Sequence, residues 1–318
     1  MTETLDMKAT LRGRRFAALH ITLKGFCMGT ADVVPGVSGG TIALILGIYQ
    51  RLLEAIGRFD VKLLKLLTRG DFAGAAKHID WLFLIPLGVG IFAALMFFTR
   101  VVSLPHLVQT QPELVFATFF GLIIGSVVLL LRGLGTLDFL GYVFLITGSL
   151  IGFGVVNLVP VETPESAWFI FVTGAVAISA LILPGISGSF LLLIMKKYAF
   201  IFDALGRFDF AVIVPFTLGA AVGLLGFSRV LVWLLRCYYE KTLLTIVGVL
   251  IGSLWVIWPF QERLYETVRD KPRVVASTPY VPDIIDGSVV TAGALALIGL
   301  ALVLLLGRLS RNASSARA

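Results

Sequence analysis

Charged residues are scarce in this chain. Asp, Glu, Lys and Arg make up 14% of its 318 residues, whereas 58% of the residues are hydrophobic. A soluble domain typically carries about 25% charged residues, so this composition excludes an ordinary water-soluble enzyme. Because apolar runs recur along the whole length, the sequence predicts an all-α polytopic membrane protein.

Cysteine and histidine are rare as well. The two cysteines, Cys27 and Cys237, lie in apolar context and provide no disulfide framework. Three scattered histidines offer no metal-ligand spacing, so we expect neither a metal nor a cofactor. The net charge of +7 is explained by basic residues beside membrane spans, and no nucleic-acid partner is expected. The basic N-terminus leads directly into a repeated segment, so we expect it not to be a cleavable signal peptide.

Two stretches interrupt the apolar runs in the same way. "DVVPGVSGG" occupies residues 32–40, and "LILPGISGS" occupies residues 181–189. With an offset of 149, residues 31–60 align with 180–209 without a gap, and 13 of the 30 positions are identical, including a closing "GRFD". "TRV" at 99–101 then matches "SRV" at 228–230, and "GLIIGS" at 121–126 matches "GVLIGS" at 248–253. Since the blocks recur in order, the chain is predicted to be an internal duplication.

The segments after the two breaks are too short to cross a membrane. Apolar stretches 37–50 and 186–195 precede the next basic residue, and at about 1.5 Å per residue they reach roughly 15–21 Å of a hydrocarbon core of about 30 Å. We therefore expect two re-entrant hairpins, 16–50 and 167–200, each followed by three transmembrane helices. The last spans, about 139–158 and 287–307, match only in hydropathy.

The chain is therefore predicted to consist of two inverted repeats. Three spans separate the hairpins, and because this number is odd, the second repeat has the opposite orientation in the membrane. The first repeat covers 1–158 and includes an N-terminal cytoplasmic segment; the second covers 159–308, and 309–318 form a disordered tail. Loop 51–80 carries six Lys or Arg residues, whereas loops 102–112 and 159–166 carry none. The positive-inside rule then places both termini in the cytoplasm.

The two breaks also predict a ligand site. Irregular backbone at membrane depth is tolerated where protein or a cavity supplies partners. Pro35 and Pro184 stop the incoming helices, and Ser38 and Ser187 are suited to cap the outgoing ones. Two helix N-termini with free N–H groups would then bind an anion; the alternative is a pair of packing breaks without a ligand. The candidates are Gly36, Val37, Ser38, Gly39, Gly40 and Thr41, with Gly185, Ile186, Ser187, Gly188 and Ser189.

Four charged residues are candidates for the same site. Arg100 and Arg229 occupy matching places in apolar spans, where an arginine is costly, and the planar guanidinium suits a phosphate. The alternative for both is snorkelling to a headgroup. Lys24 and Asp32 lie in the first hairpin, and the matching positions of the second hairpin are uncharged. Lys24 would help to bind the anion and Asp32 would titrate or hold a coupling ion, a proton or sodium; a simple ion pair between them is the alternative.

The two signatures resemble a known family. "GTADVVPGVSGGTIALILGIY" and "ALILPGISGSFLLLIM" are similar to the paired signatures of bacterial polyprenyl-phosphate transporters, the PopT-like proteins, over about residues 16–307. The resemblance implies a transporter rather than an enzyme, in the bacterial cytoplasmic (inner) membrane. Its substrate would be undecaprenyl phosphate, the carrier lipid of cell-wall precursors, recycled from the outer to the inner leaflet. "MKKY" at 195–198 departs from the "MGKY" expected of the family.

Two other functions fit parts of the pattern. Intramembrane lipid-pyrophosphate phosphatases also combine inverted repeats with Pro-Gly-x-Ser motifs, but their motifs add glutamates and an arginine beside the serine, where this chain has Gly39 and Gly188. A channel or transporter for a small inorganic anion would use the same N–H groups without a lipid. A lipid site should instead open sideways into the bilayer between apolar side chains.

Overall fold

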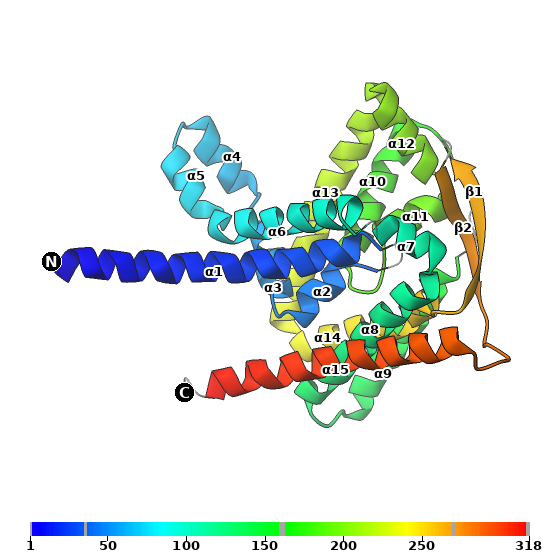
Figure 1. Cartoon of the computed structure of the whole chain (residues 1–318). Coiled ribbons are helices and arrows are strands. Elements are labelled where there is room, and N and C mark those ends of the chain that lie inside the picture. Colours follow the sequence, from blue (N-terminus) through cyan, green and yellow to red (C-terminus); the bar gives the residue numbers. More distant parts are fainter. Residues whose placement is uncertain (1, 35–36, 103, 159–162, 269–270, 316–318) are drawn as a thin grey trace.

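The computed structural model describes residues 2–34, 37–102, 104–158, 163–268 and 271–315, and these are mainly helical (Figure 1). The first half contains α1 (Thr2–Asp32), α2 (Gly39–Ile45), α3 (Tyr49–Gly57), α4 (Val61–Thr68), α5 (Phe72–His78), α6 (Trp81–Arg100), α7 (Leu104–Thr110), α8 (Pro112–Leu134) and α9 (Phe139–Val156). The second half contains α10 (Ala167–Ile182), α11 (Gly188–Ile194), α12 (Tyr198–Arg207), α13 (Phe210–Cys237), α14 (Tyr239–Ser253), the 3-10 helix η1 (Leu254–Ile257), β1 (Gln261–Val268), β2 (Lys271–Pro279) and α15 (Gly287–Ser315).

Six helices of the described chain are long and apolar enough to cross a membrane: α6, α8, α9, α13, α14 continued by η1, and α15. They form two groups of three, as the sequence predicted, and each group follows a broken segment; α9 and α15 begin where the last spans were predicted to begin. In the first broken segment, α2 and α3 are bent by 119°, close to Gly47, whose φ is +67°. The predicted polytopic helical architecture is thereby confirmed.

Aspartates occupy the N-cap position of several helices in the described chain, among them α4 and α13. Asp60 accepts the N–H of Leu63 over 2.9 Å at the start of α4, and Asp209 accepts the N–H of Ala211 over 3.1 Å at the start of α13. The Leu63 N–H holds the pKa of the Asp60 carboxyl below its usual value, and His78 adds to this effect. Since Asp60 and Asp209 close the two GRFD motifs, these motifs are helix caps.

The same helix contact occurs once in each half. α1 packs along α6, and α10 packs along α13. A Cβ at Gly25 would overlap the carbonyl oxygen of Leu87, and a Cβ at Gly174 would overlap that of Phe216. Gly25 corresponds to Gly174 with the offset of 149, and Leu87 corresponds to Phe216 in the block that aligns Pro86 with Pro215. Each glycine therefore allows the same close approach between helix backbones.

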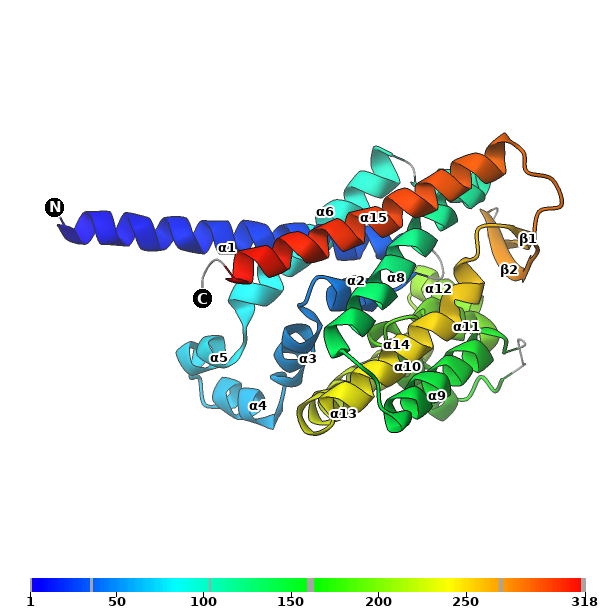
Figure 2. The ribbon, with the colours of Figure 1, turned by 90° about the horizontal axis from the view of Figure 1, so that it is seen from below.

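A second pair of matching contacts joins the two halves. α8 packs along α15, and α14 packs along α9 (Figure 2). A Cβ at Gly121 would meet the carbonyl oxygen of Ala296, and a Cβ at Gly248 would meet that of Leu145. These contacts give Leu145 and Ala296 equivalent places in α9 and α15, an equivalence that hydropathy alone did not provide.

Two parts of the chain differ from the prediction. Loop 260–286 contains two antiparallel strands that pair from Gln261 opposite Pro279 to Val268 opposite Lys271, with a register shift between Leu264 and Tyr265, so the all-α prediction is wrong there. "RLYETV" and "RVVAST" are rich in β-branched and aromatic residues, which was the available signal. α15 continues to Ser315, although a disordered tail was predicted from residue 309. The stretch 309–315 contains no proline or glycine that would stop the helix.

Candidate functional site

The two helix breaks lie against each other. The N–H of Gly185 donates to Thr41 Oγ1 over 3.0 Å, and Ser38 Oγ donates to the carbonyl oxygen of Leu181 over 3.2 Å. The Tyr49 hydroxyl donates to the carbonyl oxygen of Ile182 over 3.3 Å. Two motifs far apart in the sequence thus form one junction between the start of α2 and the end of α10, with Ser38 and Thr41 buried in it.

Glycine allows this close approach at residue 40. A Cβ there would lie 2.7 Å from the carbonyl oxygen of Ile182, which is too close for any side chain. Val37 and Ile186 are buried beside the junction. Tyr49 was not predicted as a site residue, although its identity with Tyr198 in the repeat was an available signal. Pro35 and Gly36, also predicted here, lie outside the described residues.

The start of α2 is closed by groups of the protein itself. Ser38 Oγ accepts the N–H of Gly40 over 3.2 Å, so the predicted cap is confirmed. The carboxylate of Asp32 accepts the N–H of Gly39 over 2.8 Å. The expectation of free N–H groups at this helix start is therefore wrong for this conformation, because a carboxylate already occupies the place of the expected anion.

The start of α11 has the same sequence pattern but different partners. Ser187 occupies the N-cap position without a side-chain cap bond, and its Oγ lies 2.8 Å from Ser189 Oγ. Leu181 stands where the first half has Asp32. Within the described residues, no hydrogen bond from the N–H of Gly188 or Ser189 is present. Of the two helix starts, the second is therefore the one whose first N–H groups have no partner among the described residues.

Lys24 and Asp32 lie at opposite ends of α2. Lys24 Nζ donates to the carbonyl oxygen of Leu46 over 2.7 Å, at the C-terminal end of the helix, whereas Asp32 binds at the N-terminal end. Both charges have the sign that a helix dipole favours at that end. The alternative of an ion pair between them does not agree with this arrangement.

Within the described residues, neither Arg100 nor Arg229 has a hydrogen bond or ion pair to a residue of the junction. Arg229 is exposed on α13, and its guanidinium donates to the carbonyl oxygen of Phe59 over 3.4 Å, in the turn that follows α3. Arg100 is exposed at the end of α6. A different cation, Lys197, is buried after α11, where it donates to the carbonyl oxygen of Thr163 over 2.8 Å.

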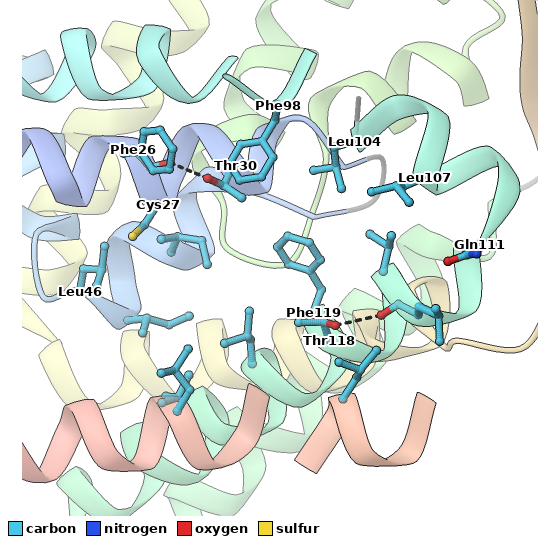
Figure 3. A pocket seen from close by; sticks show the side chains of 18 residues that line it. Phe26, Cys27, Thr30, Leu46, Phe98, Leu104, Leu107, Gln111, Thr118 and Phe119 are labelled. Carbon is cyan, nitrogen blue, oxygen red and sulfur yellow. Dashed lines mark hydrogen bonds between the residues drawn. The ribbon is translucent and has the colours of Figure 1, made fainter. Parts of the chain in front are cut away.

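A large apolar pocket lies beside the first broken segment (Figure 3). Its volume is about 570 Å³. Its walls come from α1, α2, the end of α6, α7, α8 and α15, with Phe26, Leu46, Phe98, Phe119 and Leu302 among the lining residues. These walls consist almost entirely of hydrocarbon side chains.

The few polar groups in the pocket walls offer little to a charged ligand. The hydroxyls of Thr30 and Thr118 donate within their own helices, to the carbonyl oxygens of Phe26 and Leu114 (Figure 3). Gln111 lies at the α7–α8 end of the pocket. The pocket is therefore suited to a hydrocarbon chain, and it shares α2 with the polar junction.

Comparison with known proteins gives consistent matches. The family model described as undecaprenyl phosphate translocase-like matches residues 28–309. A protein of Vibrio cholerae named polyprenyl-phosphate transporter is 42% identical over 254 residues, which is 80% of this chain and 82% of the relative. A Staphylococcus aureus protein of the same name is 33% identical over 260 residues, 74% of this chain and 85% of the relative. No solved structure matches significantly.

Proposed function

The chain belongs to the undecaprenyl phosphate translocase-like family, and from this premise we propose that it moves undecaprenyl phosphate from the outer to the inner leaflet of the bacterial cytoplasmic membrane. The carrier lipid of cell-wall precursors would thereby be recycled. Both relatives are named transporters rather than enzymes. We assign the chain the same substrate class, a phosphate on a long isoprenoid chain.

The apolar pocket is the observation that carries this proposal. Its volume of about 570 Å³ lies within the range of roughly 300–1,000 Å³ that is usual for ligand sites. Walls from α1, α2, α8 and α15 would hold the isoprene units next to the phosphate, and the rest of the tail would extend into the bilayer. An inorganic anion would gain nothing from such walls, because they supply no charge.

The proposed topology is a pair of inverted repeats. Three apolar helices, α6, α8 and α9, separate the two broken segments. The matching contacts at Gly25 and Gly174, and at Gly121 and Gly248, support equivalent folds for the two halves. We propose that both broken segments are re-entrant, which would leave the termini in the cytoplasm and make the site reachable from either leaflet in turn.

The phosphate would bind at the junction of the two breaks. The N–H groups of Gly188 and Ser189 and the hydroxyls of Ser187 and Ser189 would be the donors there, on the side where no carboxylate of the described residues accepts these N–H groups. Such groups at a helix start favour an anion. Thr41, bonded to Gly185 in this conformation, holds the two breaks together around the headgroup.

Asp32 would compete with the phosphate for the N–H groups at the start of α2. In this conformation its carboxylate holds the N–H of Gly39, so a phosphate at Gly39 and Gly40 has to displace an anion of the protein. Binding of a proton or a sodium ion to the displaced carboxylate would favour this exchange. Lys24, Arg100 and Arg229 would act at a distance from the junction, as positive charges that attract the phosphate group before it binds.

The phosphatase alternative receives no support from the junction. Among the residues that the structure describes, the hydrogen bonds of Ser38 Oγ go to backbone groups, the N–H of Gly40 and the carbonyl oxygen of Leu181. A serine nucleophile needs an adjacent base. The carboxylate of Asp32 accepts the N–H of Gly39 and has no hydrogen bond to Ser38 Oγ among the described residues.

Binding can be tested with the purified protein and two tryptophan variants. Leu122→Trp places a large ring in the pocket, whereas Leu150→Trp places the same ring on an exposed face of α9. We expect native mass spectrometry to detect undecaprenyl phosphate on the unmodified protein and on Leu150→Trp, with strongly reduced occupancy on Leu122→Trp. Equal lipid occupancy of the two variants would show that the pocket is not part of the binding site. Absence of the lipid from all three proteins would show that undecaprenyl phosphate is not the ligand.

A further inference from the structure

The segment between α3 and α6 forms a small helical lobe of α4 and α5. The two helices pack on each other, and neither packs extensively against another helix of the described chain. In both views they lie side by side at the edge of the molecule, near the start of α6 (Figure 1, Figure 2). Leu63 on α4 and Ala75 on α5 are buried, and the carboxylates of Asp60 and Asp71 cap the two helix starts. The lobe is therefore stabilised mainly by its own contacts.

The helical lobe exposes apolar side chains that its own small core does not use. Val61 is 66% exposed, Leu64 is 61% exposed and Phe72 is 71% exposed. Val61, Leu64 and Leu67 follow one another at a spacing of three residues. Since successive residues of an α-helix turn by about 100°, these three lie along one side of α4. We call Val61, Leu64, Leu67 and Phe72 the lobe strip.

The helical lobe also carries basic side chains without a counter-charge: Lys62, Lys65, Arg69 and Lys77. Within the described residues, none of these four has an ion pair or a side-chain hydrogen bond. The three carboxylates of the segment 58–80 are already engaged. Asp60 and Asp71 accept N–H groups at the helix starts, and Asp80 is paired with Arg51 over 2.9 Å. The lobe therefore presents uncompensated positive charge next to exposed apolar surface.

The place of the helical lobe in the chain sets its depth in the membrane. α5 ends at His78, and α6, which is long and apolar enough to cross a membrane, begins at Trp81. Tryptophan is enriched at the boundary between membrane and water. Lysine and arginine side chains are costly within the hydrocarbon core, so the lobe does not lie deeper than this boundary. The lobe is thus at the level of the lipid headgroups.

We infer that the helical lobe docks onto the surface of the adjacent leaflet and binds its anionic phospholipid headgroups. The lobe strip enters the upper part of the acyl chains, and the basic side chains stay among the headgroups. Amphipathic helices bind a membrane surface through exactly these two contributions, apolar area and attraction to anionic lipids. In the proposed topology this is the cytoplasmic leaflet, whose surface potential is negative. Because α4 follows α3 directly, docking holds the end of the first broken segment at a fixed depth.

Two labelled variants test the docking. Leu64→Cys and Lys62→Cys are made separately in a background in which Cys27 and Cys237 are replaced by alanine. Each variant is labelled with an environment-sensitive fluorophore and placed in phosphatidylglycerol nanodiscs that contain a fixed fraction of phosphatidylcholine spin-labelled on its acyl chain. The two positions point to opposite sides of α4, so the Leu64→Cys label should lie about 10 Å deeper, which is the diameter of a helix.

Two results would overturn the docking. One is an equal depth of the two labels, or no quenching of either label by the spin-labelled lipid. The other is a Leu64→Cys label that is shielded from aqueous iodide but not quenched by the lipid, since a second copy of the chain would then cover the lobe strip instead of the membrane.

A series of nanodiscs from pure phosphatidylcholine to pure phosphatidylglycerol tests the role of the charge. Quenching of the Leu64→Cys label should rise with the phosphatidylglycerol content. Adding Lys65→Gln and Arg69→Gln should weaken docking by about 30-fold, so more phosphatidylglycerol is needed for the same quenching. The control pair Lys241→Gln and Arg308→Gln removes two exposed charges from α14 and α15 and should leave the curve unchanged. Quenching that is independent of phosphatidylglycerol, or an equal shift by both pairs, would show that anionic headgroups are not the partner.

These measurements are independent of the proposed function. The nanodiscs contain no undecaprenyl phosphate, and their two leaflets have the same composition, so neither the substrate nor the orientation of the chain affects the result. Failure of the transport assay would reject the proposed function and leave the docking of the helical lobe intact. Failure of the labels to detect the lipid would reject the docking and leave the transport proposal intact.

Discussion

Gly39→Ala should cost more stability than one methyl group would suggest. A Cβ at residue 39 would lie 2.6 Å from both carboxylate oxygens of Asp32 and 2.9 Å from its Cγ. The carboxylate must therefore move, and it then loses the N–H of Gly39 that it accepts over 2.8 Å. Because a hydrogen bond to a charged group contributes about 1.5–3 kcal/mol, we expect the free energy of unfolding to fall by a similar amount.

SDS titration in mixed micelles measures this free energy, and two further variants make the result specific. Gly88→Ala in α6 adds a methyl group where nothing lies within 4 Å, and it should stabilise the helix by about 0.5–1 kcal/mol. The double variant Asp32→Ala/Gly39→Ala loses the same bond only once, so its cost should resemble that of either single change. Additive costs, or a Gly39→Ala protein that behaves like Gly88→Ala, would refute the role assigned to Asp32.

Three other predictions concern the junction, the charges and the topology. Ser38→Ala removes a helix cap and a link between the breaks, so it should lower stability by about 1–2 kcal/mol and leave a reduced but measurable transport rate in liposomes; an inactive but folded variant would favour a serine nucleophile. Arg229→Lys keeps the charge but loses the planar guanidinium, so transport should fall while gel filtration remains unchanged, and an unchanged rate would leave Arg229 without a role in transport. Thr68→Cys and Arg207→Cys should react with a membrane-impermeant maleimide from opposite sides of the membrane, and labelling from the same side would reject the inverted arrangement.

Most of the architecture could be predicted because it depends on patterns that are local in sequence. Hydropathy placed the six spans, and the repeated Pro-Gly-x-Ser-Gly motif placed both helix breaks. Ser38 was predicted as a cap from its residue type and position, and the structure confirms it. The link between Thr41 and Gly185 agrees with the expectation that the two motifs share one site, since both belong to the predicted set.

The remaining features depend on how side chains are oriented and how helices are arranged in space, which local sequence patterns do not give. Hydropathy places Arg229 within a span, but it does not give the side of α13 on which the guanidinium lies, next to the Phe59 carbonyl. Asp32 was recognised as unusual, yet its bond to Gly39 depends on how the chain turns between α1 and α2. The pocket lies between side chains of α1, α2, α6, α7, α8 and α15, an arrangement that the pattern of no single helix predicts.

Transport of undecaprenyl phosphate between leaflets tests the central claim most directly. The purified protein is reconstituted into liposomes that carry a fluorescent undecaprenyl phosphate, and a membrane-impermeant quencher reports the fraction in the outer leaflet over time. We predict that the protein accelerates exchange between the leaflets, that Leu122→Trp abolishes the acceleration, and that Leu150→Trp does not. Exchange at the rate of protein-free liposomes, with the protein folded and entrapped inorganic phosphate released instead, would contradict the account.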